Sequence, residues 1–204
     1  MIELLHIDCM EYMKTLKDKS FDLAIVDPPY GLGDKLTNGG TWASKYSKGD
    51  ASWDIAPTQE YFIELMRVSK NQIIWGGNYF TLPTNRCFLI WDKVAHMDTL
   101  ADCEYAWTSF DKNAKIFKHV RNTSEERIHI TQKPVKLYNW ILKNYSEKGQ
   151  RILDTHLGSG SSAISAHYFG VDFVGCEISK EYYDNACKRF KTCTSQFQIF
   201  QPNL

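Results

Sequence analysis

The feature that most constrains the fold is the stretch 151–179, RILDTHLGSGSSAISAHYFGVDFVGCEIS. An apolar run ends in a glycine turn, a segment of small residues follows, and a second apolar run ends in Glu177. This order is typical of a strand, a helix and a second strand parallel to the first. Further strand-like runs cover 2–8, 21–27, 72–76 and 88–91, and helical periodicity covers 58–69 and 133–145. Strands that alternate with helices predict an α/β fold with a mostly parallel sheet flanked by helices.

The length of 204 residues favours one domain, 1–204, with a small insertion. Residues 93–130 break the alternation because they are polar, basic and aromatic, and we expect a hairpin around 104–110. In the two helical segments, Thr58 is placed as an N-cap and Pro134 falls in the first turn. The sequence therefore predicts a single domain that carries a small inserted region.

Charge is unevenly distributed, although the net charge is zero. Residues 1–64 hold six basic and eleven acidic side chains, whereas residues 112–148 hold nine basic and three acidic ones. The basic stretch is compatible with a face that binds a polyanion, and equally with an ordinary solvated surface.

Composition also limits the class of protein. No apolar run approaches the roughly 18 residues that cross a bilayer, and the acids among the first ten residues argue against a signal peptide. The six cysteines lack CxxC spacing. We therefore expect reduced, buried thiols in a cytoplasmic protein with no metal site and no membrane association; a zinc site is the weaker alternative.

The glycine turn matches G-x-G-x-x-A through Gly158, Gly160 and Ala163, and Glu177 follows Gly158 by 19 positions. Glycines let a ligand approach the backbone, and an acid at the tip of the next strand can accept hydrogen bonds from two ribose hydroxyls. Two ligand classes use this arrangement: dinucleotides, whose pyrophosphate binds at the helix N-terminus, and S-adenosylmethionine (SAM), which has no phosphate. The turn alone does not choose between them, and it is also compatible with a tight strand–helix connection.

A second distinctive stretch is AIVDPPYG, residues 24–31. The two prolines end the apolar run because proline cannot continue a β-ladder, and they fix the backbone beside Asp27. A strand that ends in a turn is the simpler interpretation. The alternative is that the rigid turn holds a carboxylate and the ring of Tyr30 for catalysis.

Three segments resemble the amino-group DNA methyltransferases, which methylate adenine N6 or cytosine N4. Asp27-Pro28-Pro29-Tyr30 is similar to their catalytic motif, THLGSGSS to their SAM loop, and IHITQKPVKLYNWIL (128–142) to the segment before that loop. The catalytic motif precedes the SAM loop, and this circularly permuted order is that of the β class. The resemblance covers nearly the whole chain. It implies a Rossmann-like SAM-dependent methyltransferase fold in which 93–130 is an inserted target-recognition region.

The resemblance implies catalysis by residues 27–30. Asp27 and the carbonyl of Pro28 would accept hydrogen bonds from the target amino group and aim its lone pair at the methyl group of SAM. This amino group is a poor nucleophile because its lone pair is delocalised into the ring, so positioning and electrostatics would supply the catalysis. Pro29 would keep the turn rigid, and Tyr30 would stack on a base flipped out of the duplex.

The same resemblance implies a set of SAM-binding residues. Glu177 would bind the ribose hydroxyls, Asp8 the adenine amino group with the backbone of Cys9 beside it, and Lys133 the carboxylate. The methionine end would be lined by Asp154, Gly158, Gly160, Ser161 and Ser162. Surface charge is the simpler interpretation of Asp8 and Lys133.

The chain departs from the family pattern after the aspartate of the SAM loop. Relatives usually have Pro-Phe there, where this chain has Thr155-His156, and a threonine pair where it has Ser161-Ser162. The serines keep the hydroxyls, but His156 replaces an aromatic wall with a titratable one. We hypothesise that SAM binding survives because imidazole still packs flat; absence of binding by calorimetry at neutral pH would disprove this.

Recognition of DNA would involve residues 93–130. Four basic side chains are expected to contact phosphates: Lys112, Lys115, Lys118 and Arg121. Trp42 and Tyr46 would close over the flipped base, unless they pack within their own loop. Because the region is short, we expect a short target, loose specificity or a homodimer that shares the work. Double-stranded DNA is the expected partner, and the sequence leaves open whether a cognate restriction nuclease accompanies the enzyme or whether it is an orphan.

Other activities explain fewer of the motifs. Cytosine C5 methylation requires a Pro-Cys nucleophile, and no proline here precedes a cysteine. An NAD(P)-dependent oxidoreductase would use GSGSSA and Glu177 but leave DPPY and TQKP without a role. A non-catalytic nucleic-acid-binding module would not need the acidic motif. DPPY resembles the adenine enzymes more often, whereas cytosine N4 enzymes of this order commonly have a serine in place of Asp27. We therefore predict a site-specific adenine-N6 DNA methyltransferase, with cytosine N4 as the alternative.

Overall fold

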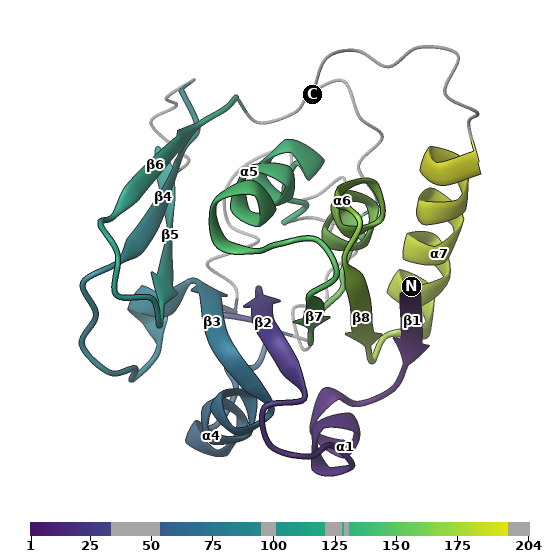
Figure 1. The fold of residues 1–204 in the computed structure, drawn as a ribbon, viewed down its shortest axis with the longest axis horizontal. Coiled ribbons are helices and arrows are strands. Elements are labelled where there is room, and N and C mark those ends of the chain that lie inside the picture. The colour runs from purple at the N-terminus through teal and green to yellow at the C-terminus, as the bar shows by residue number, and fades with distance from the viewer. Residues whose placement is uncertain (34–53, 95–100, 121–127, 129–130, 196–204) are drawn as a thin grey trace.

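The computed structural model describes residues 1–33, 54–94, 101–120, 128 and 131–195. Its strands are β1 (Ile2–His6), β2 (Phe21–Val26), β3 (Ser69–Trp75), β4 (Phe88–Asp92), β5 (Cys103–Thr108), β6 (Lys115–Lys118), β7 (Arg151–Asp154) and β8 (Asp172–Glu177). Its helices are α1 (Cys9–Lys14), α4 (Gln59–Val68), α5 (Val135–Tyr145), α6 (Ser161–Phe169), α7 (Lys180–Ser195) and the short 3-10 helix η1 (Gly77–Tyr79). Figure 1 shows these elements in place.

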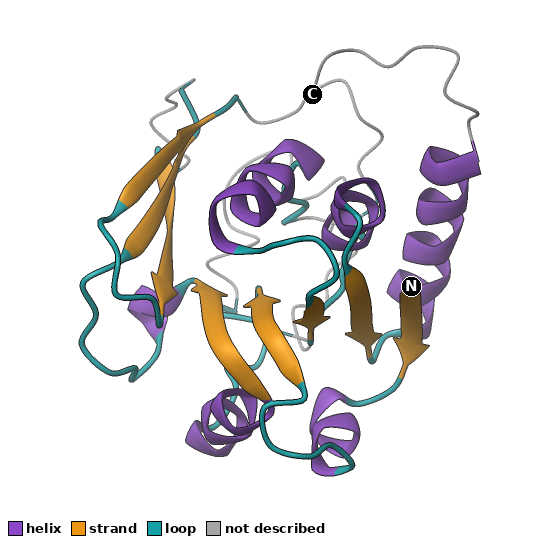
Figure 2. Cartoon of the chain, in the orientation of Figure 1, coloured by secondary structure: helices purple, strands orange, loops and turns teal. Residues whose placement is uncertain are grey.

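The eight strands of the described residues form one sheet in the order β1-β8-β7-β2-β3-β5-β4-β6. Every neighbouring pair is parallel except the two pairs that contain β5, which runs antiparallel to β3 and to β4. Figure 2 shows the strands between two groups of helices. The predicted α/β fold, with a mostly parallel sheet flanked by helices, is confirmed.

The strand β5 is an internal member of this sheet. Ala106 of β5 lies opposite Trp75 of β3 on one side and opposite Leu89 of β4 on the other. The local hairpin expected around 104–110 is therefore wrong, because these residues form one strand whose two partners come from elsewhere in the chain. Beyond β4, β6 forms the edge of the sheet. Part of the 93–130 region is thus built into the sheet itself.

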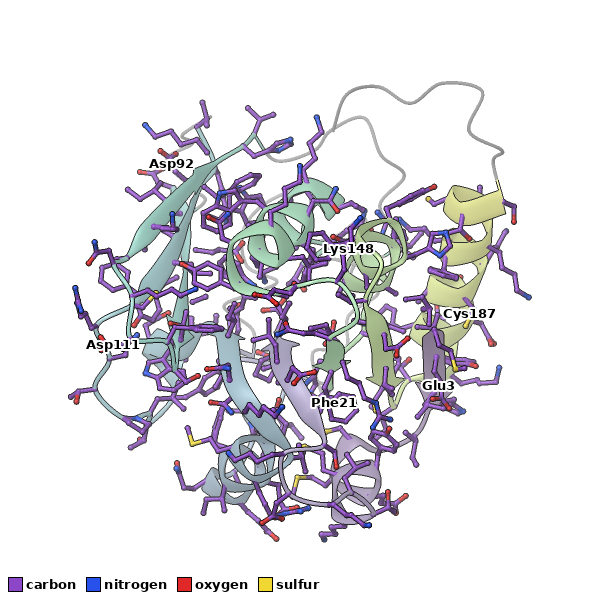
Figure 3. The ribbon with its side chains drawn as sticks, viewed as in Figure 1. Glu3, Phe21, Asp92, Asp111, Lys148 and Cys187 are labelled. Atoms are coloured by element: carbon purple, nitrogen blue, oxygen red, sulfur yellow. The ribbon has the colours of Figure 1, made fainter. Side chains whose placement is uncertain are left out.

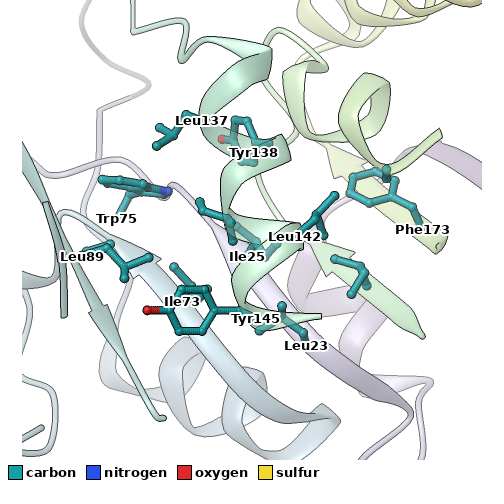
Figure 4. Close-up of a cluster of buried hydrophobic side chains, with 14 of the residues drawn as sticks. Leu23, Ile25, Ile73, Trp75, Leu89, Leu137, Tyr138, Leu142, Tyr145 and Phe173 are labelled. Atoms are coloured by element: carbon teal, nitrogen blue, oxygen red, sulfur yellow. The ribbon is translucent and has the colours of Figure 1, made fainter. Parts of the chain in front are cut away.

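The strand β2 lies at the centre of the protein and is buried on both faces, which is why it reads as a continuous apolar run. Leu23 and Ile25 belong to a core cluster with residues of α5, α6 and α7, part of which Figure 4 shows. Ala24 and Val26 belong to a second cluster with residues of α1 and α4. Because successive side chains of a strand point to opposite faces, this alternation defines the two helical layers.

The carboxyl ends of neighbouring strands bring three acids to one edge of the sheet. Asp27 follows the last residue of β2, while Asp154 and Glu177 are the last residues of β7 and β8. These three strands are adjacent and parallel. Ligands of open α/β sheets bind beyond this edge, so it is where a site is expected.

The predicted ends of the helices differ slightly from the observed ones. Thr58 is the N-cap residue of α4, as predicted, although its side chain makes no capping hydrogen bond. Pro134 is the N-cap residue of α5 and not a member of its first turn. All six cysteines are free. Among the described residues, no helix combines the length and apolar character that a membrane span requires.

Candidate active site

A pocket opens beside Asp27 and Glu177, with a volume of about 140 Å³. It is lined by four segments and three single residues: 27–30, 131–133, 156–159, 177–179, Asp54, Tyr138 and Tyr182. The turn after β2 and the loop after β7 therefore face the same space, although they are far apart in the sequence. The two distinctive sequence stretches, 24–31 and 151–179, therefore both contribute to one site.

The turn after β2 is held by Asp54, which no sequence motif predicts as a site residue. This buried carboxylate accepts hydrogen bonds from the backbone N–H groups of Tyr30 (3.0 Å), Gly31 (3.1 Å) and Gly33 (2.8 Å). Three donors compensate the loss of hydration of a buried charge. Asp54 thus fixes the conformation of the turn, and no motif reveals it because its partners are backbone groups.

Tyr30 is bonded to the aspartate of its own motif, because its hydroxyl donates to Asp27 Oδ1 at 2.6 Å. Its ring stacks on Tyr79, with 4.9 Å between the ring centroids. Gly76 has a φ of +67°, and a Cβ at this position would overlap the ring of Tyr30. Burial and the carboxylate of Asp27 raise the pKa of Tyr30 well above its ordinary value. The phenol therefore stays protonated and remains a donor to Asp27.

Lys133 of the TQKP segment reaches the same aspartate. Its Nζ lies 2.5 Å from Asp27 Oδ2 and 3.0 Å from Glu104 Oε2, and Lys93 Nζ lies 2.8 Å from Glu104 Oε1. Burial alone would lower the pKa of Lys133, but Asp27 and Glu104 raise it. Burial likewise acts to raise the pKa of Glu104, but Lys133 and Lys93 lower it to about 2. Both Lys133 and Glu104 are therefore charged at neutral pH.

Glu104 and Lys93 are two further site residues that no sequence motif predicts. Glu104 lies near the start of β5 and Lys93 directly follows β4. Because β5 is antiparallel to its neighbours, its first residues lie at the carboxyl edge of the sheet, where the pocket is. The one indication in the sequence is a glutamate beside the apolar run YAW of a strand-like segment.

Glu177 closes the loop that follows β7. Its Oε2 accepts the backbone N–H of Gly158 at 2.9 Å, and its Oε1 accepts that of Ser179 at 2.9 Å. Each oxygen of a carboxylate can accept a second hydrogen bond. Glu177 lines the pocket, so it keeps acceptor capacity for a ligand while it fixes the loop.

The glycine loop is also held by α7. Gly160, the N-cap residue of α6, has a φ of +73°, and a Cβ there would lie 3.3 Å from the Cβ of Ala186. The guanidinium of Arg189 donates to the carbonyl of Ser159 at 2.8 Å and to Ser161 Oγ at 2.9 Å. The loop is thus fixed by the protein itself.

Asp154 is buried behind this loop. Its Oδ2 accepts the hydroxyl of Ser162 at 2.6 Å, and its Oδ1 accepts the backbone N–H of His156 at 3.0 Å. Burial is the main cause that raises the pKa of Asp154 to about 7. Burial also lowers the pKa of His156 to about 4, so this imidazole is neutral at pH 7.

The ring of His156 is oriented by two hydroxyl groups. Thr155 Oγ1 lies 2.9 Å from His156 Nδ1 and 2.6 Å from the hydroxyl of Tyr61. Donation from Tyr61 to Thr155, and from Thr155 to His156, gives both hydroxyl protons an acceptor and places the ring proton on Nε2. His156 is therefore a fixed polar element of the pocket wall.

The predicted SAM-binding residues fall into two groups. Lys133, His156, Gly158 and Glu177 line the pocket, whereas the others lie outside its lining: Asp8, Cys9, Asp154, Gly160, Ser161 and Ser162. Asp8 is the N-cap residue of α1, where its Oδ1 accepts the backbone N–H groups of the next turn, and Cys9 begins that helix. The roles predicted for these residues toward SAM stay predictions.

Three of the residues predicted to contact DNA lie outside the described residues: Trp42, Tyr46 and Arg121. Lys115 and Lys118 are exposed on the edge strand β6, and Lys118 Nζ lies 3.9 Å from Asp92 Oδ2. Lys112 lies over two aromatic rings. Figure 3 labels Asp92 and Asp111 at opposite ends of this part of the sheet. Contact of these lysines with DNA stays a prediction.

Comparison with known families decides the class of protein. The family model for N6/N4 DNA methylases matches residues 74–188, which is more than half of the chain. The chain belongs to this DNA methylase family. The match runs from β3 into α7 and includes Glu104, Lys133 and the glycine loop with Glu177. The protein is therefore an amino-group DNA methyltransferase that acts on N6 or N4.

Individual relatives agree with this assignment. The type II methyltransferase M.HinfI of Haemophilus influenzae is 25% identical over 90% of this chain and 67% of its own length. The crystal structure of the M1.HpyAVI–SAM complex has a TM-score of 0.62 at 22% identity, over 93% of this chain and 100% of that chain. PvuII DNA methyltransferase, described as cytosine-N4-specific, has a TM-score of 0.64 at 12% identity, over 100% of this chain and 88% of that chain. The predicted Rossmann-like methyltransferase fold is confirmed.

Proposed function

We propose that this protein transfers a methyl group from SAM to the exocyclic N6 of adenine in DNA, at a specific sequence and after base flipping. One observation carries the proposal: a single pocket is lined both by Asp27–Tyr30 and by the glycine loop with Glu177. A methyl donor held by Glu177 and a base held by Asp27 would meet inside it. Membership of the amino-group family supports the class of reaction.

The part of the pocket around Glu177 fits SAM. The carboxylate of Glu177 offers lone pairs to two ribose hydroxyls, Leu157 and Ile178 offer apolar contacts, and Gly158 keeps side-chain atoms away from the ligand. SAM, when bound, supplies a methyl group on a positively charged sulfur. The similar fold of M1.HpyAVI, which was crystallised as a complex with SAM, supports the same ligand class.

Under this proposal, Asp27 and the carbonyl of Pro28 accept hydrogen bonds from the target amino group. Asp27 is already held by Tyr30 and Lys133, and Pro28 is buried, so neither acceptor has to reorganise when the base arrives. Preorganised acceptors aim the nitrogen lone pair and stabilise the positive charge that develops on nitrogen. The ring of Tyr30, which lines the pocket, is the surface on which the flipped base stacks.

Adenine is favoured over cytosine by one residue. By the resemblance, cytosine N4 enzymes with this order of motifs commonly have a serine where this chain has Asp27. Cytosine N4 is the second candidate, because the fold of PvuII DNA methyltransferase, described as cytosine-N4-specific, covers the whole of this chain. An NAD(P)-dependent oxidoreductase is not proposed, because it gives no role to residues 27–30.

The proposal implies double-stranded DNA as the partner, residues 93–130 as its recognition region, and the cytoplasm as the location. We also expect either a homodimer or a monomer with a short or loosely specified target. Light scattering in the presence and absence of DNA distinguishes these states. Digestion of unmodified and methylated genomic DNA with lysate of the source cells tests for a cognate nuclease.

The decisive experiment incubates plasmid DNA with the protein and SAM, digests the DNA to nucleosides and identifies the modified base by mass. N6-methyladenine is expected, and Asp27→Ala should abolish it, whereas Asp18→Ala, an exposed aspartate just before the first residue of β2, should not. N4-methylcytosine as the product would favour the second candidate. Neither product, or equal activity of wild type and Asp27→Ala, would overturn the proposed function.

A further inference from the structure

A row of four alternating charges runs from the end of β4 into the pocket. It consists of Lys93, Glu104, Lys133 and Asp27, with contacts of 2.8, 3.0 and 2.5 Å between successive members. Lys93 and Lys133 are nearly fully buried, with side chains 7% and 2% exposed, whereas Glu104 and Asp27 are 25% and 16% exposed. Buried charges are costly unless each is paired, and in this row each charge touches one of opposite sign.

The donors of Lys133 are directed at groups of the protein. An ammonium group has three N–H donors. Two of them face carboxylates, Asp27 Oδ2 and Glu104 Oε2, and the hydroxyl oxygen of Tyr30 lies 3.5 Å from the same Nζ. The ammonium also lies over the ring of Trp75, 5.3 Å from its centroid. This arrangement competes with the role predicted from the sequence, in which Lys133 binds the carboxylate of SAM.

We propose that Lys133, held in place by Glu104, is a positioning residue that fixes the direction of the Asp27 carboxylate. This inference rests on the proposed role of Asp27 as the acceptor for the target amino group. Tyr30 holds one oxygen of Asp27 and Lys133 holds the other. Each oxygen retains a second lone pair for the incoming amino group. The two hydrogen bonds thereby hold the carboxylate group of Asp27 in one orientation before the base enters.

Glu104 supports this role because it gives the buried ammonium of Lys133 a second carboxylate partner besides Asp27. Glu104 also links the proposed recognition region to Asp27. It lies in β5, within residues 93–130, and its ion pair reaches Lys133, which lies outside that region and contacts Asp27. Lys93 in turn pairs with the other oxygen of Glu104 and limits its rotation. In this row each side chain therefore orients the next: Lys93 orients Glu104, Glu104 orients Lys133, and Lys133 orients Asp27.

The first test separates positioning from SAM binding. Lys133→Met removes the charge but keeps a long side chain; Lys70→Met is the matched control, because Lys70 pairs with Asp22 at the opposite edge of the sheet. At saturating SAM, we expect Lys133→Met to lower the single-turnover methylation rate by about 100-fold, the cost typical of a misplaced catalytic group. The dissociation constant of SAM, from calorimetry, should be unchanged, and Lys133→Arg should recover part of the rate.

Two variants refine this test. Glu104→Gln should give a smaller loss of the same kind, with SAM affinity unchanged. Combined with Lys133→Met, Glu104→Gln should cause no further loss, because Glu104 acts through Lys133. Weakened SAM binding with an unchanged saturating rate in Lys133→Met would overturn the inference and assign Lys133 to the cofactor.

The second test does not depend on methylation. Asp27→Asn should lower the melting temperature of the wild type, because it removes a partner of buried Lys133. The same change should raise the melting temperature of Lys133→Met, because it neutralises a carboxylate that has lost its cation. The same sign in both backgrounds would overturn the pairing. If the wild type modifies no base at all, the proposed function fails. The melting temperatures of the wild type, the two single variants and the double variant still show whether Lys133 and Asp27 form an ion pair.

Discussion

The ring of Tyr30 fills the space in which a side chain at Gly76 would begin. Gly76 comes directly after β3, and its left-handed φ turns the chain into η1, whose last residue, Tyr79, stacks on the same ring. We expect Gly76→Ala to displace Tyr30 and, through their hydrogen bond, Asp27. The rate of methylation should fall by roughly 10- to 100-fold, measured as single-turnover product at saturating SAM.

The matched control for this change is Gly149→Ala. Gly149 also has a left-handed φ, of +80°, but a Cβ there would meet nothing within 4 Å among the described residues. Both variants carry the backbone strain of an alanine in that region. Only Gly76→Ala should lose activity; an equal loss in both would show that the contact with Tyr30 is irrelevant.

Asp54 should contribute to stability through the turn that follows β2. Asp54→Asn retains one acceptor oxygen but turns an amide donor toward at least one of the three backbone N–H groups. Since hydrogen bonds to charged groups are worth more than neutral ones, we expect the free energy of unfolding to fall by about 1–3 kcal/mol. Urea denaturation measures this, with Asp111→Asn, an aspartate with its side chain 87% exposed, as the control that should change little.

Glu177 should set the affinity for SAM. Glu177→Gln loses one acceptor oxygen and the negative charge, and so weakens hydrogen bonds to the ribose hydroxyls. The dissociation constant of SAM should rise by about 10- to 100-fold, the equivalent of one charged hydrogen bond. Calorimetry measures it, and Glu181→Gln, an exposed residue of the first turn of α7, is the control. Unchanged affinity in Glu177→Gln would contradict the predicted ribose contact.

Asp154 and His156 should make opposite contributions to the pH dependence of stability. Burial raises the pKa of Asp154 from 3.8 to about 7, so the folded protein binds more protons and this contribution falls as pH rises through that window. Burial lowers the pKa of His156 from 6.5 to about 4, so the folded protein binds fewer protons and this contribution grows as pH rises from about 4 to 6.5. In the wild type the two trends partly cancel.

Replacing either Asp154 or His156 should reveal the effect of the other residue on the pH dependence of the free energy of unfolding. The free energy of unfolding of His156→Phe should fall more steeply than that of the wild type between pH 4 and 6.5. That of Asp154→Asn should instead rise, relative to the wild type, between pH 4 and 6.5. Denaturation at a series of pH values measures both slopes, and slopes of the same sign relative to the wild type would refute the pairing of trends.

Lys115 tests the predicted contact with DNA. If its exposed ammonium meets a phosphate, Lys115→Ala should weaken binding to all DNA sequences alike. It should also reduce the slope of the logarithm of affinity against the logarithm of salt concentration by about one. Fluorescence anisotropy at several salt concentrations measures the slope. Lys14→Ala, at an exposed position of α1, should leave it as in the wild type.

The residues that could be predicted from the sequence are those whose structural role depends only on neighbouring residues in the chain. The prolines after Asp27 stop β2 and fix the turn whatever else surrounds them, and the glycine loop lies within one strand–helix–strand unit. The strand ends were less accurate. The run 2–8 was expected to be a strand, but β1 ends at His6 because Asp8 caps the following helix.

The residues that the sequence did not reveal depend on contacts between distant segments. Asp54 binds backbone groups that have no side-chain signature, and Glu104 enters the site only because β5 inserts antiparallel between β3 and β4. The direction of a strand is decided by the whole sheet, so composition could not reveal it. For the same reason, 104–110 was misread as a local hairpin.

The order of strands also has a consequence for synthesis on the ribosome. The central strand β2 needs β7 along one edge, with Leu23 opposite Ile152, and β1 needs β8, with Ile2 opposite Phe173. These two partners are the last strands of the described residues to leave the ribosome. Until then the apolar strand β2 has an unpaired edge, the condition under which nascent chains associate with wrong partners. We infer that residues 151–177 are needed for folding as much as for catalysis.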